Sequence, residues 1–294
     1  MLKMWRKKFL KNGKQLFIHE TPGEKGTIIG VHGLTGHHMQ LGHYQKAFEK
    51  QFRMITYDLR GRGKSSEADP STCIDQHVDD LVELIDLLKV ERPILMGYSM
   101  GAYICLKAAS RLENVGAVIL LDGAAETDEG QKELILPSLV RLKTPYSTRL
   151  DYITQTRKAY EKLGIRWSEH MNRIVNYEIE KQGDHWEHKS DSKLIEKDFM
   201  SFFDYNVEQY APSITAPVLL VQATGHMVGR RPLFYDFQFY KLEQLINTIE
   251  TIKTKANHLT LVFNKQVELE WRMLDFLNRH FSLIDHESTN CQNR

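Results

Sequence analysis

The side chain best placed to do chemistry is a serine held between two glycines, in the stretch Gly97-Tyr98-Ser99-Met100-Gly101. This stretch matches the pattern G-x-S-x-G, in which a sharp strand-to-helix turn exposes the serine hydroxyl. The apolar residues 93–96 predict a buried strand before it, and residues 100–111, rich in Ala, Leu and Lys, predict a helix after it. The two glycines let neighbouring backbone approach closely. We therefore predict that Ser99 is a nucleophile.

A nucleophilic serine needs a base within hydrogen-bonding distance, because its hydroxyl reacts poorly near neutral pH. The chain contains 13 histidines, of which His258 follows the last predicted strand. A loop at that point returns to the carboxyl edge of the sheet, where it can place an imidazole beside Ser99. His280 and His286 lie on or beyond the last predicted helix. The sequence thus favours His258 as the base.

Apolar runs alternate with helical patterns along the chain. Buried strands are expected at residues 27–31, 53–57, 94–98, 117–121 and 218–222, with a leading antiparallel strand at 15–19 and a last strand, near an edge, at 248–253. Amphipathic helices are expected at residues 74–88 and near the C-terminus, the latter with a face formed by Val267, Trp271, Leu274, Phe276, Leu277 and Phe281. This order predicts an α/β fold with a mainly parallel, doubly wound sheet of about eight strands. Its ligand site should lie at the carboxyl ends of the strands.

One long segment interrupts the alternation. Residues 124–216 contain helical patches and many aromatic side chains but no convincing strand, and they far exceed an ordinary connection. We interpret them as a helical cap inserted over the strand ends. The predicted division is a core in two parts, residues 1–123 and 217–284, with the cap at 124–216 and a polar, disordered tail at 285–294.

Four motifs in this order resemble those of the α/β-hydrolase superfamily, in particular its serine esterases and lipases with a helical cap. They are the loop His32-Gly33-Leu34-Thr35-Gly36, the turn Asp58-Leu59-Arg60-Gly61-Arg62-Gly63-Lys64-Ser65, the stretch around Ser99, and Asn257-His258. The resemblance implies an oxyanion hole formed by the backbone N–H groups of Leu34 and Met100. It also implies that the side chains of Leu34, Tyr98 and Met100 line the acyl pocket, and that no cofactor is needed.

The acid partner of the histidine departs from the usual family pattern. The family commonly places it after the strand assigned here to residues 218–222, but the loop 223–231 contains no carboxylate. Some members, including pancreatic-type lipases, carry the acid at the end of the preceding strand, where this chain has Asp122. A carboxylate there can accept the Nδ1 proton of His258 and stabilise the imidazolium. We favour Asp122, with Glu126 and Asp236 as alternatives.

Several other polar groups have simpler explanations than catalysis. Two groups of histidines could suggest a metal site: His37, His38 and His43, and His185 with His188. No Asp, Glu or Cys pattern completes such a site, so we expect solvated loop histidines and no metal. Asp58 is expected to bond backbone amides in a structural turn. Cys105 is expected to be a small core residue.

Composition disfavours several function classes. The 294 residues include 39 Lys plus Arg against 38 Asp plus Glu, so no charge excess indicates nucleic acid or an acidic lipid surface. No apolar run approaches the roughly 18 residues of a membrane span, and residues 3–14 lack the apolar core of a signal peptide. The three cysteines cannot all pair. We expect a cytoplasmic protein with a small-molecule substrate and with neither a nucleic-acid nor a membrane partner.

The favoured function is a serine hydrolase of the carboxylesterase type (EC 3.1.1), which cleaves a carboxylic ester of a small or medium, mainly apolar substrate. The same three residues could instead act on a lactone, a thioester or a C–C bond. A hypothesis of another class is a catalytically weak ligand receptor, supported by the missing carboxylate after Gln222. Epoxide hydrolases and dehalogenases are disfavoured, because they need a carboxylate where Ser99 stands. Neither the physiological substrate nor the oligomeric state follows from the sequence.

Overall fold

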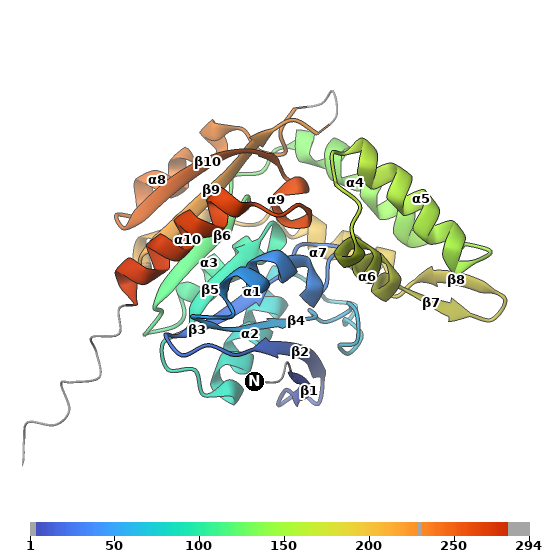
Figure 1. Cartoon of the computed structure of the whole chain (residues 1–294). Helices are drawn as coiled ribbons and strands as arrows, with labels where there is room; N and C mark the ends of the chain where they lie inside the picture. The colour runs from blue at the N-terminus through green and yellow to red at the C-terminus, as the bar shows by residue number, and fades with distance from the viewer. Residues whose placement is uncertain (1–3, 228–230, 282–294) are drawn as a thin grey trace, which may run out of the picture.

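The computed structural model describes residues 4–227 and 231–281. Its centre is an eight-stranded sheet in the order β1-β2-β4-β3-β5-β6-β9-β10 (Figure 1). The strands are β1 (Met4–Phe9), β2 (Gln15–Thr21), β3 (Thr27–Val31), β4 (Arg53–Tyr57), β5 (Ile94–Tyr98), β6 (Ala117–Leu121), β9 (Val218–Gly225) and β10 (Ile249–Asn257). Strand β2 pairs antiparallel with β1 and β4, and all pairs from β4 to β10 are parallel. The predicted mainly parallel sheet of about eight strands is confirmed.

The strands that are most buried are the ones whose ends were predicted correctly. Strands β3, β4, β5 and β6 begin and end at the predicted residues, because each is an almost wholly buried apolar run. Strand β1 was not expected at all. Its sequence MWRKKF is basic and largely exposed, as suits an edge strand, where charged side chains discourage pairing with other chains.

Helices cover both faces of the sheet (Figure 1). One hydrophobic cluster includes residues of α2 (Ile74–Leu88), α3 (Met100–Ala109) and α8 (Tyr240–Leu245). A second includes residues of α1 (Gly42–Phe48), α9 (Thr260–Phe263) and α10 (Val267–His280). The doubly wound arrangement is thus confirmed. Short 3-10 helices η1 (His38–Leu41) and η4 (Asp236–Phe239) precede α1 and α8.

The predicted buried face of the C-terminal helix is wrong in part. The side chains of Val267 and Trp271 in α10 are exposed, whereas Leu269, Met273 and Phe276 are buried. The buried residues repeat at helical spacing on a face that points away from Trp271. Trp271 is 73% exposed.

Between β6 and β9 the chain leaves the sheet. Residues 124–216, called the insertion below, contain α4 (Glu129–Lys143), α5 (Arg149–Lys162), α6 (Glu169–Glu178), α7 (Ser192–Met200), η2 (Val207–Gln209) and η3 (Ala211–Ser213). They also contain an antiparallel hairpin of β7 (Ile179–Gln182) and β8 (His185–His188), which corrects the expectation that no strand occurs here. The two residues Gly183-Asp184 form its turn, with Gly183 at φ +60°. In Figure 1 the hairpin and α4–α6 lie to one side of the sheet.

None of the helices in residues 4–227 and 231–281 is long and apolar enough to cross a lipid bilayer. The predicted tail at 285–294 lies outside the described residues.

Candidate active site

Ser99 occupies a strained turn between β5 and α3. Its backbone has φ 53° and ψ −118°, a conformation that residues with a Cβ rarely adopt. The flanking glycines are required by close backbone approach. A Cβ on Gly97 would lie 2.1 Å from the carbonyl oxygen of Gly101, and one on Gly101 would lie 2.2 Å from that of Val31. The predicted strand-to-helix turn at the G-x-S-x-G pattern is therefore present.

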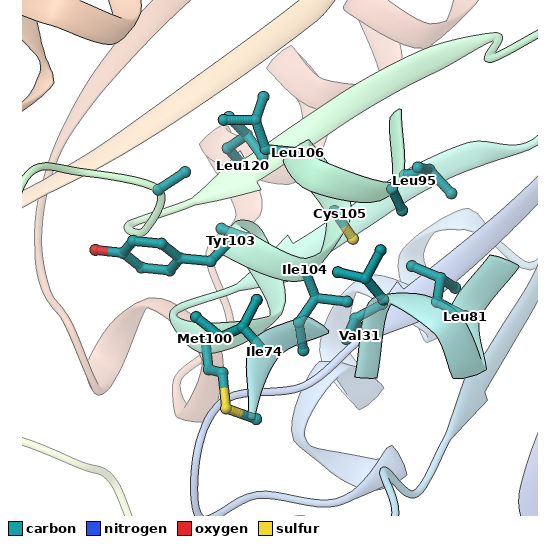
Figure 2. Packing of buried hydrophobic residues seen from close by; sticks show 14 of the residues in the cluster. Val31, Ile74, Leu81, Leu95, Met100, Tyr103, Ile104, Cys105, Leu106 and Leu120 are labelled. Atoms are coloured by element: carbon teal, nitrogen blue, oxygen red, sulfur yellow. The ribbon is translucent and has the colours of Figure 1, made fainter. Parts of the chain in front are cut away.

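Helix α3 is held rigidly behind this turn. Tyr103, Ile104 and Leu106 of α3 belong to the same buried cluster as Val31, Leu95 and Leu120 of three neighbouring strands (Figure 2). Cys105 lies in this cluster as well, and burial raises the pKa of its thiol, so the prediction of a core cysteine is confirmed. Met100 is also buried there, rather than lining the cavity described below. The expectation for its side chain was wrong because the first turn of α3 points into the core.

The structure brings Ser99, His258 and Asp122 together at the carboxyl ends of β5, β10 and β6. His258 Nε2 lies 3.1 Å from Ser99 Oγ, and His258 Nδ1 lies 2.7 Å from Asp122 Oδ2. All three side chains are buried, with Ser99 the most accessible at 9%. Asp122 accepts a hydrogen bond from the N–H at Nδ1 of His258. Nε2 is then free to accept a hydrogen bond from the serine hydroxyl.

Three further contacts fix this arrangement. The Tyr98 ring stacks on the His258 ring with centroids 4.9 Å apart, and its hydroxyl donates to the His258 carbonyl oxygen at 2.9 Å. The second oxygen of Asp122, Oδ1, accepts from the backbone N–H of Ala223 at 2.9 Å. Asp122 itself adopts φ 46° directly after β6. The carboxylate is therefore anchored on one side and aimed at the histidine on the other.

The two alternative acids lie elsewhere. Glu126 pairs with Lys241 at 2.8 Å, and Asp236 pairs with Lys253 at 2.6 Å. Both pairs are half-exposed. Of the three candidate carboxylates, Asp122 is the one that contacts His258. The ligand-receptor hypothesis rested on the missing carboxylate in the loop after Gln222. Asp122 places a carboxylate beside His258 from another strand, so that support is removed.

The loop after β3 is clamped by side chains that hydrogen-bond its backbone. Gln40 accepts from the Gly33 N–H at 2.8 Å, and His32 Nδ1 donates to the Gly33 carbonyl at 2.7 Å. His32 Nε2 accepts from the Leu59 N–H at 3.0 Å, so the ring is neutral with its proton on Nδ1. Burial lowers the pKa of His32 to about 3, which keeps it neutral. Because the peptide is planar, these bonds also orient the N–H of Leu34.

Arg62 completes this clamp and links it to the insertion. Its Nε and Nη2 donate to the Leu34 carbonyl oxygen at 3.1 and 3.0 Å, and its Nη1 lies 2.6 Å from Asp198 Oδ2 in α7. Asp198 also accepts from Thr72 at 2.6 Å and contacts His77 at 3.1 Å. Burial opposes ionisation, yet the charges of Arg62 and His77 hold the pKa of Asp198 well below its usual range. Sequence reasoning missed this pair, because nothing local connects residues on separate segments.

Replacing Asp198 with asparagine is expected to destabilise the fold by about 3 kcal/mol, because Arg62 would keep a buried charge without a partner. Urea unfolding at neutral pH measures this change. The wild-type advantage exists above the pKa of an unfolded aspartate, near 4, and is lost as the pH falls toward the lower folded value. The difference in unfolding free energy between the wild type and Asp198→Asn should therefore become smaller in acid. Asp275→Asn, which alters an exposed pair with Arg279, should leave stability unchanged. Equal behaviour of the two variants would contradict the assignment.

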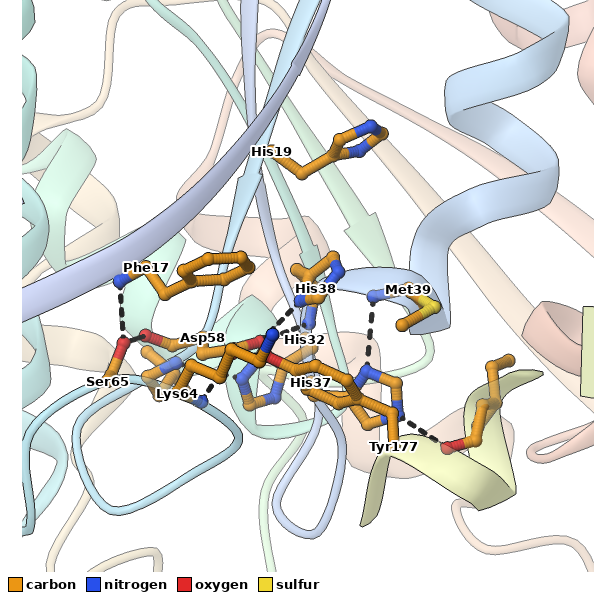
Figure 3. A network of polar contacts seen from close by, with 12 residues as sticks. Phe17, His19, His32, His37, His38, Met39, Asp58, Lys64, Ser65 and Tyr177 are labelled. Carbon is orange, nitrogen blue, oxygen red and sulfur yellow. Dashed lines mark hydrogen bonds and ion pairs between the residues drawn. The ribbon is translucent and has the colours of Figure 1, made fainter. Parts of the chain in front are cut away.

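Asp58 is a structural hub beside this loop (Figure 3). It accepts from the backbone N–H groups of His38 and Lys64, each at 2.9 Å, which confirms the predicted turn role. It also accepts from His38 Nδ1 at 2.7 Å and from the Tyr177 hydroxyl at 2.6 Å. Tyr177 belongs to α6, so its hydrogen bond to Asp58 connects the insertion to the core, as the Arg62–Asp198 pair also does.

The expectation of solvated histidines was wrong for most of them. His37, His38 and His188 are buried, and His43 and His185 are half-buried. The ligand atoms of His37, His38 and Asp58 lie within 4.8 Å of one another, as in a metal site. Apart from His38 Nε2, however, these ring nitrogens and carboxylate oxygens already bond protein groups. His37 bonds the Ile174 carbonyl and the Met39 N–H through its two ring nitrogens, and His38 Nδ1 bonds Asp58.

A cavity of about 720 Å³ opens beside Ser99 and His258. Core residues on its wall include Leu34 and Tyr98, as predicted, and the insertion adds Leu134, Ile135 and Phe202. Of the aromatic residues of the insertion, Tyr160 and Phe202 line the cavity. Others, such as Tyr152 and Phe199, are buried in the packing of the insertion itself. The site thus combines a serine hydroxyl within hydrogen-bonding distance of a histidine with a largely apolar cavity.

Comparisons with known proteins agree with this fold. Residues 26–261 match the family model described as alpha/beta hydrolase fold. The chain is 34% identical over 113 residues to the AB hydrolase superfamily protein YisY of Bacillus subtilis, a match covering 37% of this chain and 42% of that protein. It is 26% identical over 160 residues to lipase LipV of Mycobacterium tuberculosis, covering 54% and 58%. These matches thus span about half the length of the curated relatives.

Among solved structures, that of E-2-(acetamidomethylene)succinate hydrolase superposes with a TM-score of 0.82. The superposition covers 94% of this chain and all of the other, at 15% identity, so it shows the shared fold. The family model extends over most of the chain and includes all three of Ser99, Asp122 and His258. The chain therefore belongs to the alpha/beta hydrolase fold family.

Proposed function

We propose that the protein is a serine hydrolase that cleaves a carboxylic ester through an acyl-enzyme on Ser99. The observation that carries this proposal is the position of His258, with one ring nitrogen toward Ser99 Oγ and the other on Asp122. The names of its relatives, which include a lipase, agree with hydrolysis. The strained backbone of Ser99 adds support, because such strain is kept where function requires it.

In the first half-reaction, Ser99 Oγ attacks the ester carbonyl carbon while His258 Nε2 takes the hydroxyl proton. The tetrahedral intermediate collapses when His258 returns that proton to the departing alcohol. In the second half-reaction, His258 deprotonates a water that attacks the acyl-enzyme, and the proton passes back to Ser99 as the acid leaves. Asp122 holds the Nδ1 proton and stabilises the imidazolium throughout.

The negative oxygen of each intermediate would be stabilised by the backbone N–H groups of Leu34 and Met100. Met100 is the first residue of α3, where N–H groups lack intrahelical acceptors and the helix dipole favours negative charge. The Leu34 peptide is held by the bonds to Gly33 and by Arg62. Such preorganised donors are each worth about 3 kcal/mol of barrier.

The insertion would act as a cap that encloses the substrate. Its residues line the cavity together with Ser99 and His258, which supports the proposed division into a core, residues 1–123 and 217–284, and a cap, residues 124–216. The cavity volume suits a small or medium substrate. A lactone or thioester would use the same groups, so a substrate panel is needed to separate these bonds.

Reaction with a fluorophosphonate probe tests the proposal, because the probe modifies only an activated serine hydroxyl. We expect fast, stoichiometric labelling, located on Ser99 by mass spectrometry of the digested protein. His258→Gln should slow labelling at least about 100-fold, since general-base catalysis contributes about that much. His185→Gln, which changes a half-exposed histidine of β8 outside the cavity, should label like the wild type. Inertness of the wild type, or labelling unaffected by His258→Gln, would contradict the mechanism.

A further inference from the structure

The cavity wall carries an unequal set of charges. Its Lys, Arg, Asp and Glu side chains are Arg141, Lys158, Lys162 and Glu178, three positive and one negative, and all four come from the insertion. The residues that the core contributes around Ser99 are apolar or uncharged, apart from histidines. The cavity is therefore polarised, with the reacting groups on the core side and the positive charge on the insertion side.

Arg141 in α4 is the most buried of these cations, with a side chain 15% exposed. Glu178 of α6 compensates its charge at 2.5 Å, and Arg141 also bonds the Tyr152 hydroxyl. Both contacts use Nη1 of Arg141. Within the described part of the chain, this leaves the Nε and Nη2 groups for a bound molecule. The guanidinium lies over the rings of Tyr152 and Tyr160, which restrict its orientation.

Lys158 and Lys162 lie one turn apart on α5 and face the same cavity, together with Gln155 and Ala159. No carboxylate in residues 4–227 or 231–281 forms an ion pair with either lysine. Arg157, on another face of the same helix, does have such a partner in Glu161. Two uncompensated ammonium groups thus stand at the exposed side of a mainly apolar cavity.

Building on the proposed function, we propose that the natural substrate is an ester carrying a carboxylate, which Arg141, Lys158 and Lys162 bind on the insertion side while Ser99 attacks the ester carbonyl. An arginine of fixed orientation suits a planar carboxylate, because its N–H groups match the two oxygens. The two lysines attract the anion to the mouth of the cavity. The apolar wall between these ends contacts the linking hydrocarbon. This refines the mainly apolar substrate expected from the sequence to an amphiphilic one.

Two matched pairs of esters test the proposal. For a carboxylate on the acyl side, mono-4-nitrophenyl adipate is compared with 4-nitrophenyl hexanoate. For the alcohol side, 4-(carboxymethyl)phenyl acetate is compared with 4-ethylphenyl acetate. Each substrate is measured with the wild type and with Lys158→Gln/Lys162→Gln, so that differences in intrinsic reactivity cancel. Arg157→Gln removes a cation from the same helix outside the cavity and serves as the control.

In at least one pair, the double variant should lower kcat/KM for the carboxylate ester roughly five- to tenfold relative to its neutral partner, as expected for two exposed charges. The pair that responds identifies the side of the ester that bears the carboxylate. Added salt should weaken the preference of the wild type for the carboxylate ester over the neutral one. It should change this preference less in the double variant. Arg141→Gln/Glu178→Gln, which removes the buried pair together, should raise KM for the same ester. Arg157→Gln should change neither ratio.

For each pair, the measured quantity is the ratio of kcat/KM for the carboxylate ester to kcat/KM for its neutral partner. A double variant in which both ratios stay within twofold of the wild-type values would overturn the proposal. If the neutral esters are hydrolysed in a Ser99-dependent manner and the ratios do not change, the carboxylate assignment alone fails. If no ester is hydrolysed and Ser99 resists the fluorophosphonate, the hydrolase mechanism fails, and the substrate assignment fails with it.

Discussion

Ser99→Ala is expected to lower kcat for 4-nitrophenyl hexanoate by about 10⁴-fold or more, because it removes the atom that forms the acyl-enzyme. No other hydroxyl in the described residues hydrogen-bonds His258 Nε2. Binding groups and backbone donors remain in the variant, so a small residual rate above that in buffer should persist. The fold should survive, since the hydroxyl makes a single hydrogen bond, to His258. Release of 4-nitrophenolate and thermal unfolding measure the two effects.

Ser110→Ala is the matched control. Ser110 follows the same helix, α3, and its hydroxyl bonds the carbonyl of Lys107, far from the cavity. Its activity should equal that of the wild type. If Ser99→Ala kept a tenth or more of the wild-type rate, another nucleophile or a direct attack by water would have to replace the mechanism proposed above.

The sequence predicts those parts of the molecule whose signals are local. Strands β3 to β6 are buried on both faces, so composition alone marks their ends. Ser99 lies in a five-residue pattern that includes both glycines required by close contacts. His258 is placed by the order of elements, because the loop after the last parallel strand returns to the same sheet edge.

Other parts depend on partners that sequence position does not reveal. The sequence left three candidates for the acid, and the pairing of Asp122 with His258 joins residues on different strands. In the sequence, Arg62 is not distinguished from the other basic residues of its turn. Its contact with Leu34 is supported by Asp198, which lies in a helix far away in the sequence. Arg141 and Glu178 are likewise joined only by packing within the insertion.

Burial of polar side chains explains the wrong expectation for the histidines. Histidines near the oxyanion loop look solvated because the loop contains several polar residues. In the structure, His37 and His38 are covered by α6 of the insertion, whose Tyr177 contacts both rings. The hairpin β7–β8 was missed for a different reason, because its strands are polar and mostly not buried, and the Gly183-Asp184 turn is its main signal.

Asp122→Asn is expected to lower kcat by about 10⁴-fold while leaving the serine, the histidine and the cavity in place. The reason is the tautomer of His258. An asparagine can still accept from the Ala223 N–H through its oxygen, which then directs its NH₂ group toward His258 Nδ1. Nδ1 must then accept a hydrogen bond rather than donate one. The ring consequently carries its proton on Nε2, where it blocks uptake of the Ser99 proton.

Glu126→Gln and Asp236→Asn separate this role from a general loss of negative charge near the site. Both carboxylates were candidates from the sequence, and both pair with lysines instead of His258. Each substitution should change kcat less than about twofold, because exposed pairs contribute little. A large loss in either variant, with Asp122→Asn close to the wild type, would transfer the acid role to that residue. A large loss in Asp122→Asn alone, with normal unfolding, is the outcome that the 2.7 Å contact between Asp122 and His258 predicts.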